Sequence, residues 1–288
     1  MLRRAAFLTL SDTSGFVIDD DLALTPLAKR GWEVETLPWN RRGMDWQQFD
    51  LVVIRSTWDY QHHAESFLSV LTEIERSGTR LDNSSEIVRW NMRKTYLRDL
   101  AACSVATVPT LWREQLGPGE LLPLFDELQS DEAVIKPVMS GNAEGAWRLD
   151  RVTAQALATE IEAYFSSRPL MIQPFERGIA DEGEFSMIYL NGLHSHSVLK
   201  VPKRGDFRVQ EEHGSEIRAV LPEPALLTAG DAAIAAIGRK LLYARADLVR
   251  SGDEFRVMEL ELVEPALYLR LDSRAPDRFA EAIQSLFD

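Results

Sequence analysis

The 288-residue chain contains a single cysteine, Cys103, and no long uncharged apolar run. One thiol cannot form an internal disulfide framework, and low cysteine use is typical of a reducing compartment. No uncharged stretch approaches the roughly 18 residues that a membrane-spanning helix needs. The apolar run at residues 5–10 is shorter than the core of a secretory signal peptide. We therefore expect a cytoplasmic protein with no membrane partner.

Basic residues are also scarce, because 32 Lys and Arg stand against 45 Asp and Glu, a formal net charge of −13. A nucleic-acid partner would need a basic face, so this balance argues against one. A bound anion such as a nucleotide would need local lysines, backbone amides or a metal ion to offset the overall charge. The length suits two domains, or compact lobes, with a core that needs no disulfides.

Three regions differ in their pattern. Residues 1–88 alternate short apolar runs with amphipathic helices, which predicts a small α/β lobe with a parallel sheet. Residues 89–170 predict a smaller α+β lobe that includes a helix from Trp90 to Ala101. Residues 171–288 predict hairpins, the first with an Asn191-Gly192 turn, followed by a terminal helix. No G-x-G-x-x-G follows the first strand, which argues against a dinucleotide site there.

The last predicted hairpin carries an acidic group. Glu259 and Glu261 alternate with apolar residues and therefore share one sheet face, and the short turn brings Asp247 beside them. Three crowded carboxylates repel one another, and a hard cation such as Mg²⁺ relieves that repulsion. The alternative is a solvated polar face whose carboxylates are neutralised by Arg245 and Arg256.

A second signal is a lysine next to a glycine-containing loop. Lys136 ends a β-type run, and the loop Ser140–Gly145 follows it closely. Glycines allow backbone amides to approach phosphate oxygens, and a lysine supplies a point charge for the same groups. The Walker pattern is absent, and a plain solvated lysine is the alternative.

Two weaker signals accompany it. Lys94 lies on the polar side of the predicted helix 90–101, where a surface role is the alternative. The run at 173–176, with Glu184 following eight residues after its last member, offers backbone groups for a base and a carboxylate for a ribose. A core strand followed by a turn explains the same residues.

Over about Ser84 to Leu271 the chain resembles the ATP-grasp superfamily. The resemblance lies in the order of its motifs: the two lysines with the glycine loop, QPFE, GEFS, R-x-D and E-x-E. The stretch LKVPKRGDFRVQEEHG resembles glutathione-synthetase-like and D-cycloserine-synthetase-like members. The segments MELELVEPALYL and DWQQFDLVVIRSTWDY look most like the D-cycloserine-synthetase-like branch. The resemblance implies an α/β fold, with an N-terminal lobe at 1–88 and a two-lobed ATP-grasp fold at 89–170 and 171–288 that holds ATP between its lobes.

The resemblance also implies a role for each matching residue. The nucleotide would be held by Lys94, Lys136, Ser140, Gly141, Gly145, Gln173, Pro174, Phe175, Glu176 and Glu184. One or two Mg²⁺ ions, or Mn²⁺, would be held by Asp247, Glu259 and Glu261. Charge on the transferred phosphoryl group and on the intermediate would be stabilised by Arg208 and Arg245.

Two departures from the family pattern stand out. Many relatives have Asn where this chain has Glu261, so we expect the extra charge to strengthen divalent-cation binding. The loop SGNAEGA has fewer glycines than that of many relatives and contains Glu144, which changes the expected phosphate contacts.

The implied reaction joins a small-molecule carboxylate to an amine, with ATP consumed through an acyl phosphate. Positioning and charge neutralisation would carry the catalysis, which explains why no Ser-His-Asp or Cys-His set is needed. Three alternatives remain: a cyclising ligase of the D-cycloserine-synthetase type, a small-molecule kinase and a silent ATP-binding module. We expect a monomer or a homodimer.

The substrate pocket is less defined. Arg55 and Ser56 end an apolar strand, at the edge where open α/β sheets place ligands, and Arg55 could clamp a carboxylate. Equally, the run RSTWDY could cap the next helix. His213 lies in the loop that contains Arg208 and could reach substrate, whereas Cys103 is interpreted as a packed residue.

Overall fold

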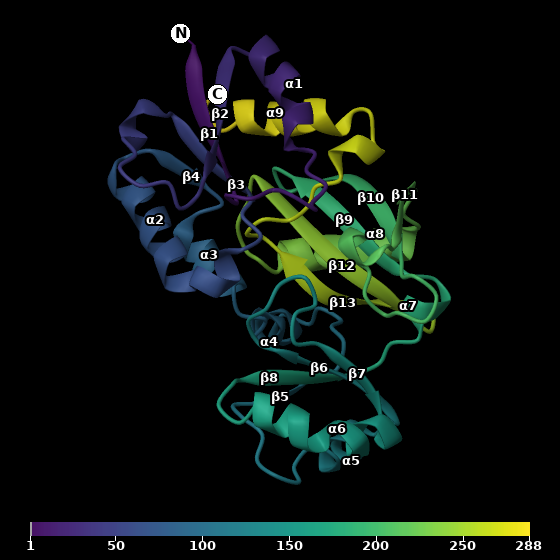
Figure 1. The fold of residues 1–288 in the computed structure, drawn as a ribbon. Coiled ribbons are helices and arrows are strands. Elements are labelled where there is room, and N and C mark those ends of the chain that lie inside the picture. Colours follow the sequence, from purple (N-terminus) through teal and green to yellow (C-terminus); the bar gives the residue numbers. More distant parts are fainter. Residues whose placement is uncertain (1) are drawn as a thin grey trace.

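The computed structural model describes residues 2–288, and Figure 1 shows their arrangement. The N-terminal lobe is built on a parallel four-stranded sheet in the order β2-β1-β3-β4, which confirms the predicted α/β layer. The strands are β1 (Arg3–Thr9), β2 (Trp32–Pro38), β3 (Leu51–Ser56) and β4 (Arg80–Asp82). The helices of this part are α1 (Leu24–Lys29), α2 (Ala64–Arg76) and α3 (Ser85–Asn91).

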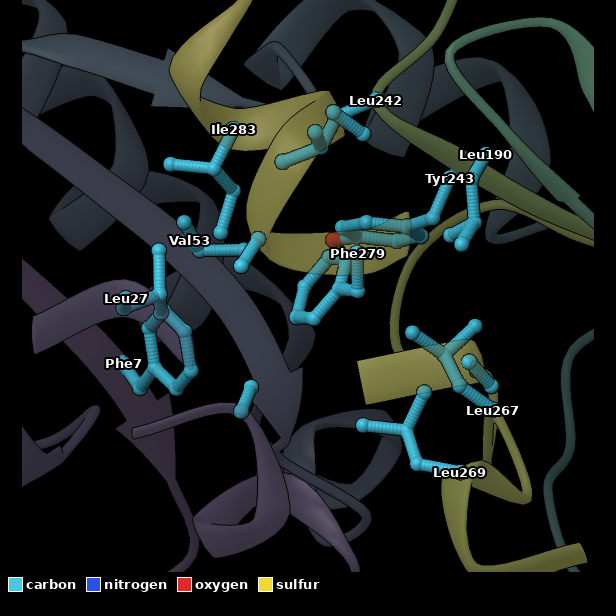
Figure 2. Packing of buried hydrophobic residues seen from close by; sticks show 14 of the residues in the cluster. Phe7, Leu27, Val53, Leu190, Leu242, Tyr243, Leu267, Leu269, Phe279 and Ile283 are labelled. Carbon is cyan, nitrogen blue, oxygen red and sulfur yellow. The ribbon is translucent and has the colours of Figure 1, made fainter. Parts of the chain in front are cut away.

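Both faces of this sheet are covered. On β1, Ala6 and Leu8 belong to the core under α2, whereas Ala5 and Phe7 belong to the core on the opposite face. The second core contains Phe279 and Ile283 of α9 (Ala275–Gln284), the last helix of the chain. Figure 2 shows these two side chains in the same cluster as Phe7. The expected terminal helix therefore packs on the N-terminal lobe and ties the two ends of the chain together.

The central lobe is an antiparallel sheet in the order β5-β8-β6-β7. Its strands are β5 (Leu111–Arg113), β6 (Glu132–Pro137), β7 (Trp147–Asp150) and β8 (Leu170–Pro174), and its helices are α5 (Pro123–Leu128) and α6 (Arg151–Tyr164). Because β8 pairs with both β5 and β6, the expected boundary between 170 and 171 separates Leu170 from the rest of its own strand.

The C-terminal lobe is a five-stranded antiparallel sheet in the order β11-β10-β9-β12-β13. Its strands are β9 (Glu184–Leu190), β10 (Leu193–Val201), β11 (Glu216–Val220), β12 (Tyr243–Ser251) and β13 (Glu254–Glu261), with helices α7 (Gly178–Asp181) and α8 (Pro224–Ala235). Asn191 and Gly192 join β9 to β10 with φ of 53° and 76°, the two positive values of a type I′ turn. In Figure 1 this sheet lies between the other two lobes.

One predicted helix is broken. The sequence predicts one helix at 90–101. In the structure α3 ends at Asn91, and a separate helix, α4 (Tyr96–Ala102), begins at Tyr96. The Asn91 amide binds the carbonyl of Leu260 at 2.7 Å, and the Leu260 N–H donates to the Tyr96 hydroxyl at 2.9 Å. Because these contacts with β13 stabilise two separate helices, Lys94 lies in the non-helical segment between α3 and α4.

Short 3-10 turns complete the described elements: Asp20–Ala23, Trp46–Gln48, Tyr60–His63, Glu211–His213 and Leu269–Leu271. No helix in residues 2–288 has the length and apolar character needed to cross a membrane.

Candidate active site

A cavity of about 230 Å³ is lined by residues from all three lobes. Trp58 and Tyr60 come from the N-terminal lobe, Lys136 from the central lobe, and Asp247 and Glu259 from the C-terminal sheet. The predicted site residues in its wall are Lys94, Lys136, Ser140, Gly141, Gln173, Pro174, Glu176, Glu184, Arg208, Arg245, Asp247, Glu259 and Glu261. The predicted site residues outside its wall are Arg55, Ser56, Gly145, Phe175 and His213.

The acidic group lies on the β12–β13 hairpin. The strand register pairs Asp247 with Glu259 and Arg245 with Glu261. The Arg245 guanidinium donates to Asp247 at 2.9 Å and also binds Glu261, so one cation bridges two of the three carboxylates. Burial, reinforced by Asp247 and Glu259, raises the pKa of Glu261 to about 7 in spite of Arg245. Crowded negative charge is therefore a property of this site.

Asp247 behaves differently from Glu261. Burial opposes its charge, yet Arg245 and Lys200 hold the pKa of the Asp247 carboxyl below its usual range. Glu259 is an ion-pair partner of Lys94, which likewise keeps the pKa of Glu259 low against the effect of burial. Two of the three carboxylates are thus stabilised as anions.

The donor set has the chemistry of a divalent-cation site, since carboxylate oxygens are the ligands that Mg²⁺ prefers. Within residues 2–288 no three acidic, His or Cys side chains converge closely enough to surround an ion as they stand. The three carboxylates instead pair with basic side chains: Asp247 and Glu261 with Arg245, and Glu259 with Lys94. The residues fit a divalent cation, and the metal site remains a prediction.

The two predicted phosphate lysines differ. Lys94 is buried, binds Glu259 and donates to the carbonyl of Ser140 at 3.1 Å. Lys136 lines the cavity but makes no side-chain hydrogen bond or ion pair with any described residue. Burial, together with the neighbouring Lys94, lowers the pKa of Lys136. An unpaired cation in a partly closed cavity is suited to an anionic ligand.

A third lysine was not predicted. Lys200 on β10 is 3% exposed, lines the cavity, pairs with Glu184 and approaches Asp247 at 3.5 Å. Nearby anions raise its pKa above the usual lysine range against the effect of burial. The available signal was a lone lysine at the end of an apolar strand, a place where lysines are seldom buried without partners. Its pairing with Glu184 means that this acid already has a cation beside it.

The predicted base-binding segment, residues 173–176, begins at the end of β8 and lies at the cavity wall. The Gln173 amide donates to the Thr110 hydroxyl at 3.0 Å, and Glu176 pairs with Arg256 at 3.1 Å. Phe175 is buried in the core beneath. Gln173 and Glu176 are thereby held in place at the cavity wall.

The glycine loop lies between two other parts of the molecule. A Cβ atom on Gly145, whose φ is 65°, would stand 2.5 Å from the Tyr164 hydroxyl, so only glycine fits there. Glu144 lies 3.4 Å from His62 of the N-terminal lobe. The His213 ring nitrogen lies 3.5 Å from the carbonyl oxygen of Asn142. His213 therefore contacts the glycine loop, and it does not line the cavity.

The loop before β11 carries Arg208 into the cavity wall. Its guanidinium is paired with Asp206 at 2.7 Å. Nearby, Arg270 binds Glu211 at 2.7 Å and Asp19 at 2.9 Å, which anchors this loop to the N-terminal lobe.

The expected substrate role of Arg55 and Ser56 has no support in this geometry. Arg55 Nε donates to Asp20 at 2.9 Å, and the Ser56 hydroxyl donates to the other Asp20 oxygen at 3.0 Å. Arg55 is 2% exposed and also donates to the carbonyl of Pro265. Both side chains therefore bind within the protein, to the carboxylate of Asp20, which is distant in the sequence.

Sequence reasoning gave no site role to the segment Val263–Tyr268, which follows β13. Successive carbonyls at 263–267 each accept a hydrogen bond from a side chain; the donors are Tyr243, Trp58, Arg55, Arg245 and His196, in that order. Tyr268 ends the segment with a φ of 48°, a left-handed conformation uncommon for an aromatic residue. Val263, Glu264, Ala266 and Tyr268 line the cavity. The segment forms a fixed part of its wall.

Comparisons with known proteins agree with the fold. Residues 5–83 match the family described as D-cycloserine synthetase DcsG, N-terminal domain. The cycloserine biosynthesis protein DcsG of Streptomyces lavendulae is 29% identical over 295 residues, which cover 95% of this chain and 96% of that protein. The crystal structure of D-cycloserine synthetase DcsG superposes with a TM-score of 0.84 and 26% identity, covering 99% of this chain and all of that one (100%).

More distant structures share the fold. An ATP-grasp RimK domain protein from Sphaerobacter thermophilus gives a TM-score of 0.72 at 15% identity, covering 97% of this chain and 98% of that one. D-alanine–D-alanine ligase from Bacillus anthracis gives 0.71 at 15% identity, covering 98% and 96%. The chain is therefore similar over its whole length to the D-cycloserine synthetase DcsG, and it has the fold of ATP-grasp ligases.

Proposed function

We propose that the protein joins a small amino-acid-like carboxylate to an amine through an acyl phosphate, with release of ADP and phosphate. The observation that carries the proposal is the polarity of the cavity. The unpaired Lys136 lines the same cavity as Asp247, Glu259 and Glu261. A nucleotide triphosphate with a divalent cation has the complementary arrangement of charge.

The reaction has two steps. A carboxylate is a poor electrophile, so its oxygen first attacks the γ-phosphorus of ATP while the bond to ADP breaks. The amine nitrogen then attacks the acyl carbon, the bond to phosphate breaks, and the nitrogen loses a proton. A bound divalent cation would neutralise charge on the phosphate oxygens.

The protein's own residues would position the reactants and offset negative charge. We assign the phosphates to Lys94 and Lys136 and the developing phosphoryl charge to Arg208 and Arg245. Gln173 to Glu176 would meet the adenine, and Glu184 the ribose. Lys200, the neighbour of Glu184 and Asp247, would add to the positive side of the same cavity.

The second candidate is an intramolecular ligase that closes a ring on one substrate. The observation in its favour is that the likeness to D-cycloserine synthetase extends over the whole chain, the N-terminal lobe included. The same nucleotide site would serve both reactions. A small-molecule kinase would stop after phosphoryl transfer, and a silent ATP-binding module would bind the nucleotide without consuming it. We further propose a cytoplasmic monomer or homodimer that acts on small molecules.

The test is ADP release with Mg²⁺ and ATP across pools of small carboxylates, with and without hydroxylamine as a surrogate amine. Release that needs both compounds, with hydroxamate formed, supports the intermolecular ligase. Release without hydroxylamine together with a product that has lost water supports the cyclising ligase, and a stable phosphorylated product indicates a kinase. Tight nucleotide binding with no ADP release in any pool would contradict the ligase proposal.

A further inference from the structure

Strand β11 is an open edge of the C-terminal sheet. It pairs with β10 along one side, and no other strand in residues 2–288 pairs with its second side (Figure 1). The opposite edge of the same sheet, on β13, is covered, because the Val257 N–H donates to the carbonyl of Ala106 at 2.8 Å and its carbonyl accepts from Val108 at 3.1 Å. The outward backbone groups of β11 are therefore available to a further strand.

The sequence of β11 allows such pairing. Its five residues, Glu216–Val220, include no proline, glycine or lysine, and their register with β10 runs without a bulge. Proline, lysine and bulges are the features that commonly protect edge strands from other chains. The residue after the strand, Leu221, is 98% exposed, the highest value among the large apolar side chains of the described residues. Contact with another chain at this edge would remove that side chain from water.

Two opposite charges stand on one face of this strand. Glu216 and Arg218 share a face, because side chains alternate along a strand, and they lie opposite Val201 and Leu199 of β10, respectively. Both side chains are exposed. Neither forms an ion pair or a side-chain hydrogen bond with another residue in 2–288. An acid and a base, two positions apart, are thus unpaired on an open edge.

The spacing of these charges suits a second copy of the same strand. Opposed residues of paired strands share a face, so a two-fold axis through antiparallel β11 strands must pass through a residue position. An axis at Glu216 or at Arg218 sets like charges opposite each other, which destabilises a sheet. An axis at Ala219 sets neither charge opposite another charge. An axis at Ile217 sets Glu216 of each chain opposite Arg218 of the partner subunit, and it also pairs the two Ile217 side chains.

We propose that two copies of the chain associate through β11 as a two-fold dimer, with Glu216 of each chain opposite Arg218 of the partner subunit. The two five-stranded sheets then form one continuous sheet of ten strands. Because the contact is self-complementary and uses the open edge of both chains, it closes at two copies and does not extend into fibres. In this register His213, in the loop that carries Arg208, lies opposite Leu221 of the partner subunit, so the dimer contact also borders that loop.

Charge reversal tests the surface and the register together. Glu216→Arg and Arg218→Glu each set like charges opposite each other in a homodimer, whereas the double variant restores opposite charges with their signs exchanged. An equimolar mixture of the two single variants also restores them, because one chain then carries two basic residues on β11 and the other two acidic ones. The matched control is Glu254→Arg, which reverses an exposed acid at the start of β13. Sedimentation velocity on the full chain, at about 10–100 µM, measures the oligomeric state.

We expect dimers from the wild type, from Glu254→Arg, from the double variant and from the mixture. Each single variant alone should have a dimer dissociation constant raised about tenfold or more, because two attractive cross-strand pairs become repulsive at once. Circular dichroism should match the wild type in every variant, since neither residue has a partner within its own chain to lose. A monomeric wild type would overturn the proposal, as would single variants that dimerise like the wild type. Folded single variants that stay monomeric when mixed would overturn it as well.

Discussion

Asp247 lies opposite Glu259 across strands β12 and β13, and each carboxylate is held by a different cation, Arg245 for Asp247 and Lys94 for Glu259. The free protein thus neutralises its proposed metal ligands with its own basic residues. Lys94 is also a proposed phosphate ligand. Entry of a divalent cation with the nucleotide would therefore exchange one set of ion pairs for another.

Glu259→Gln tests the metal assignment. We expect turnover to fall by about 100-fold or more, because an amide is a weaker ligand than a carboxylate and lacks its charge. Lys94 keeps its hydrogen bond to Ser140, so the free energy of unfolding should drop by only about 1–2 kcal/mol. ADP release over a Mg²⁺ titration and a urea melt measure the two effects, with Glu254→Gln as the control. Full activity in Glu259→Gln would refute the assignment.

Lys136→Ala tests the phosphate assignment. Lys136 has no protein partner to lose, so the free energy of unfolding should stay the same or rise. Binding of a magnesium-bound ATP analogue should weaken by about 10- to 100-fold, because a charged hydrogen-bond donor is removed. Calorimetry measures the affinity, and Lys240→Ala provides an exposed lysine for comparison. Unchanged affinity would show that Lys136 does not meet the nucleotide.

Arg55→Met separates the structural role of Arg55 from a substrate role. The substitution leaves Asp20 buried without its guanidinium partner, which should cost about 3–5 kcal/mol in the free energy of unfolding. Asp20→Asn should also destabilise the protein, whereas Asp21→Asn, at an exposed neighbour, should not. Urea unfolding measures all three variants. Wild-type stability in Arg55→Met, combined with a raised KM, would instead make Arg55 a substrate ligand.

His196 predicts how stability depends on pH. Its Nε2 binds the carbonyl of Leu267 at 2.8 Å, and its Nδ1 binds the Ser195 hydroxyl, which in turn accepts from Arg278. Burial, aided by Arg278, lowers the pKa of His196 to about 4 from 6.5. Between these values the unfolded chain binds a proton that the folded protein does not, so the unfolding free energy falls as pH is lowered, by about 3 kcal/mol in total.

The comparison that isolates this effect is His196→Gln against wild type at several pH values from 7.5 down to about 5. The difference in unfolding free energy between the two proteins should shrink as the pH falls, because only the wild type loses the contribution of the neutral imidazole. His62→Gln, at an exposed histidine, should retain the wild-type slope. Parallel pH profiles for wild type and His196→Gln would contradict the prediction.

Local patterns predicted several features that the structure contains. Alternation along β13 placed Glu259 and Glu261 together, and the short turn after β12 brought Asp247 opposite, because side chains repeat every two residues in a strand. The Asn191-Gly192 pair specified its own turn for the same kind of reason. Lys136 and its loop are adjacent in sequence, so their proximity needed no tertiary information.

Other features depend on partners far away in the chain. Nothing near Lys200 in sequence indicated that Glu184 and Asp247 would surround it, and no local signal broke the helix at Lys94. The fate of Arg55 was decided by Asp20, with which it forms an ion pair across 35 positions.

The sequence by itself determined the hairpins, the parallel layer, the acidic strand pair and, through its resemblance, the ATP-grasp fold. These follow from interactions between near neighbours and from side-chain periodicity. Only the tertiary structure decided which charged side chains form ion pairs. It also placed Glu264 on a segment whose carbonyls accept hydrogen bonds from Trp58 and from Tyr243, which are far apart in the sequence. The reason is physical: burial and ion pairing depend on what the folded chain brings together, and those partners lie too far apart in sequence to leave a local pattern.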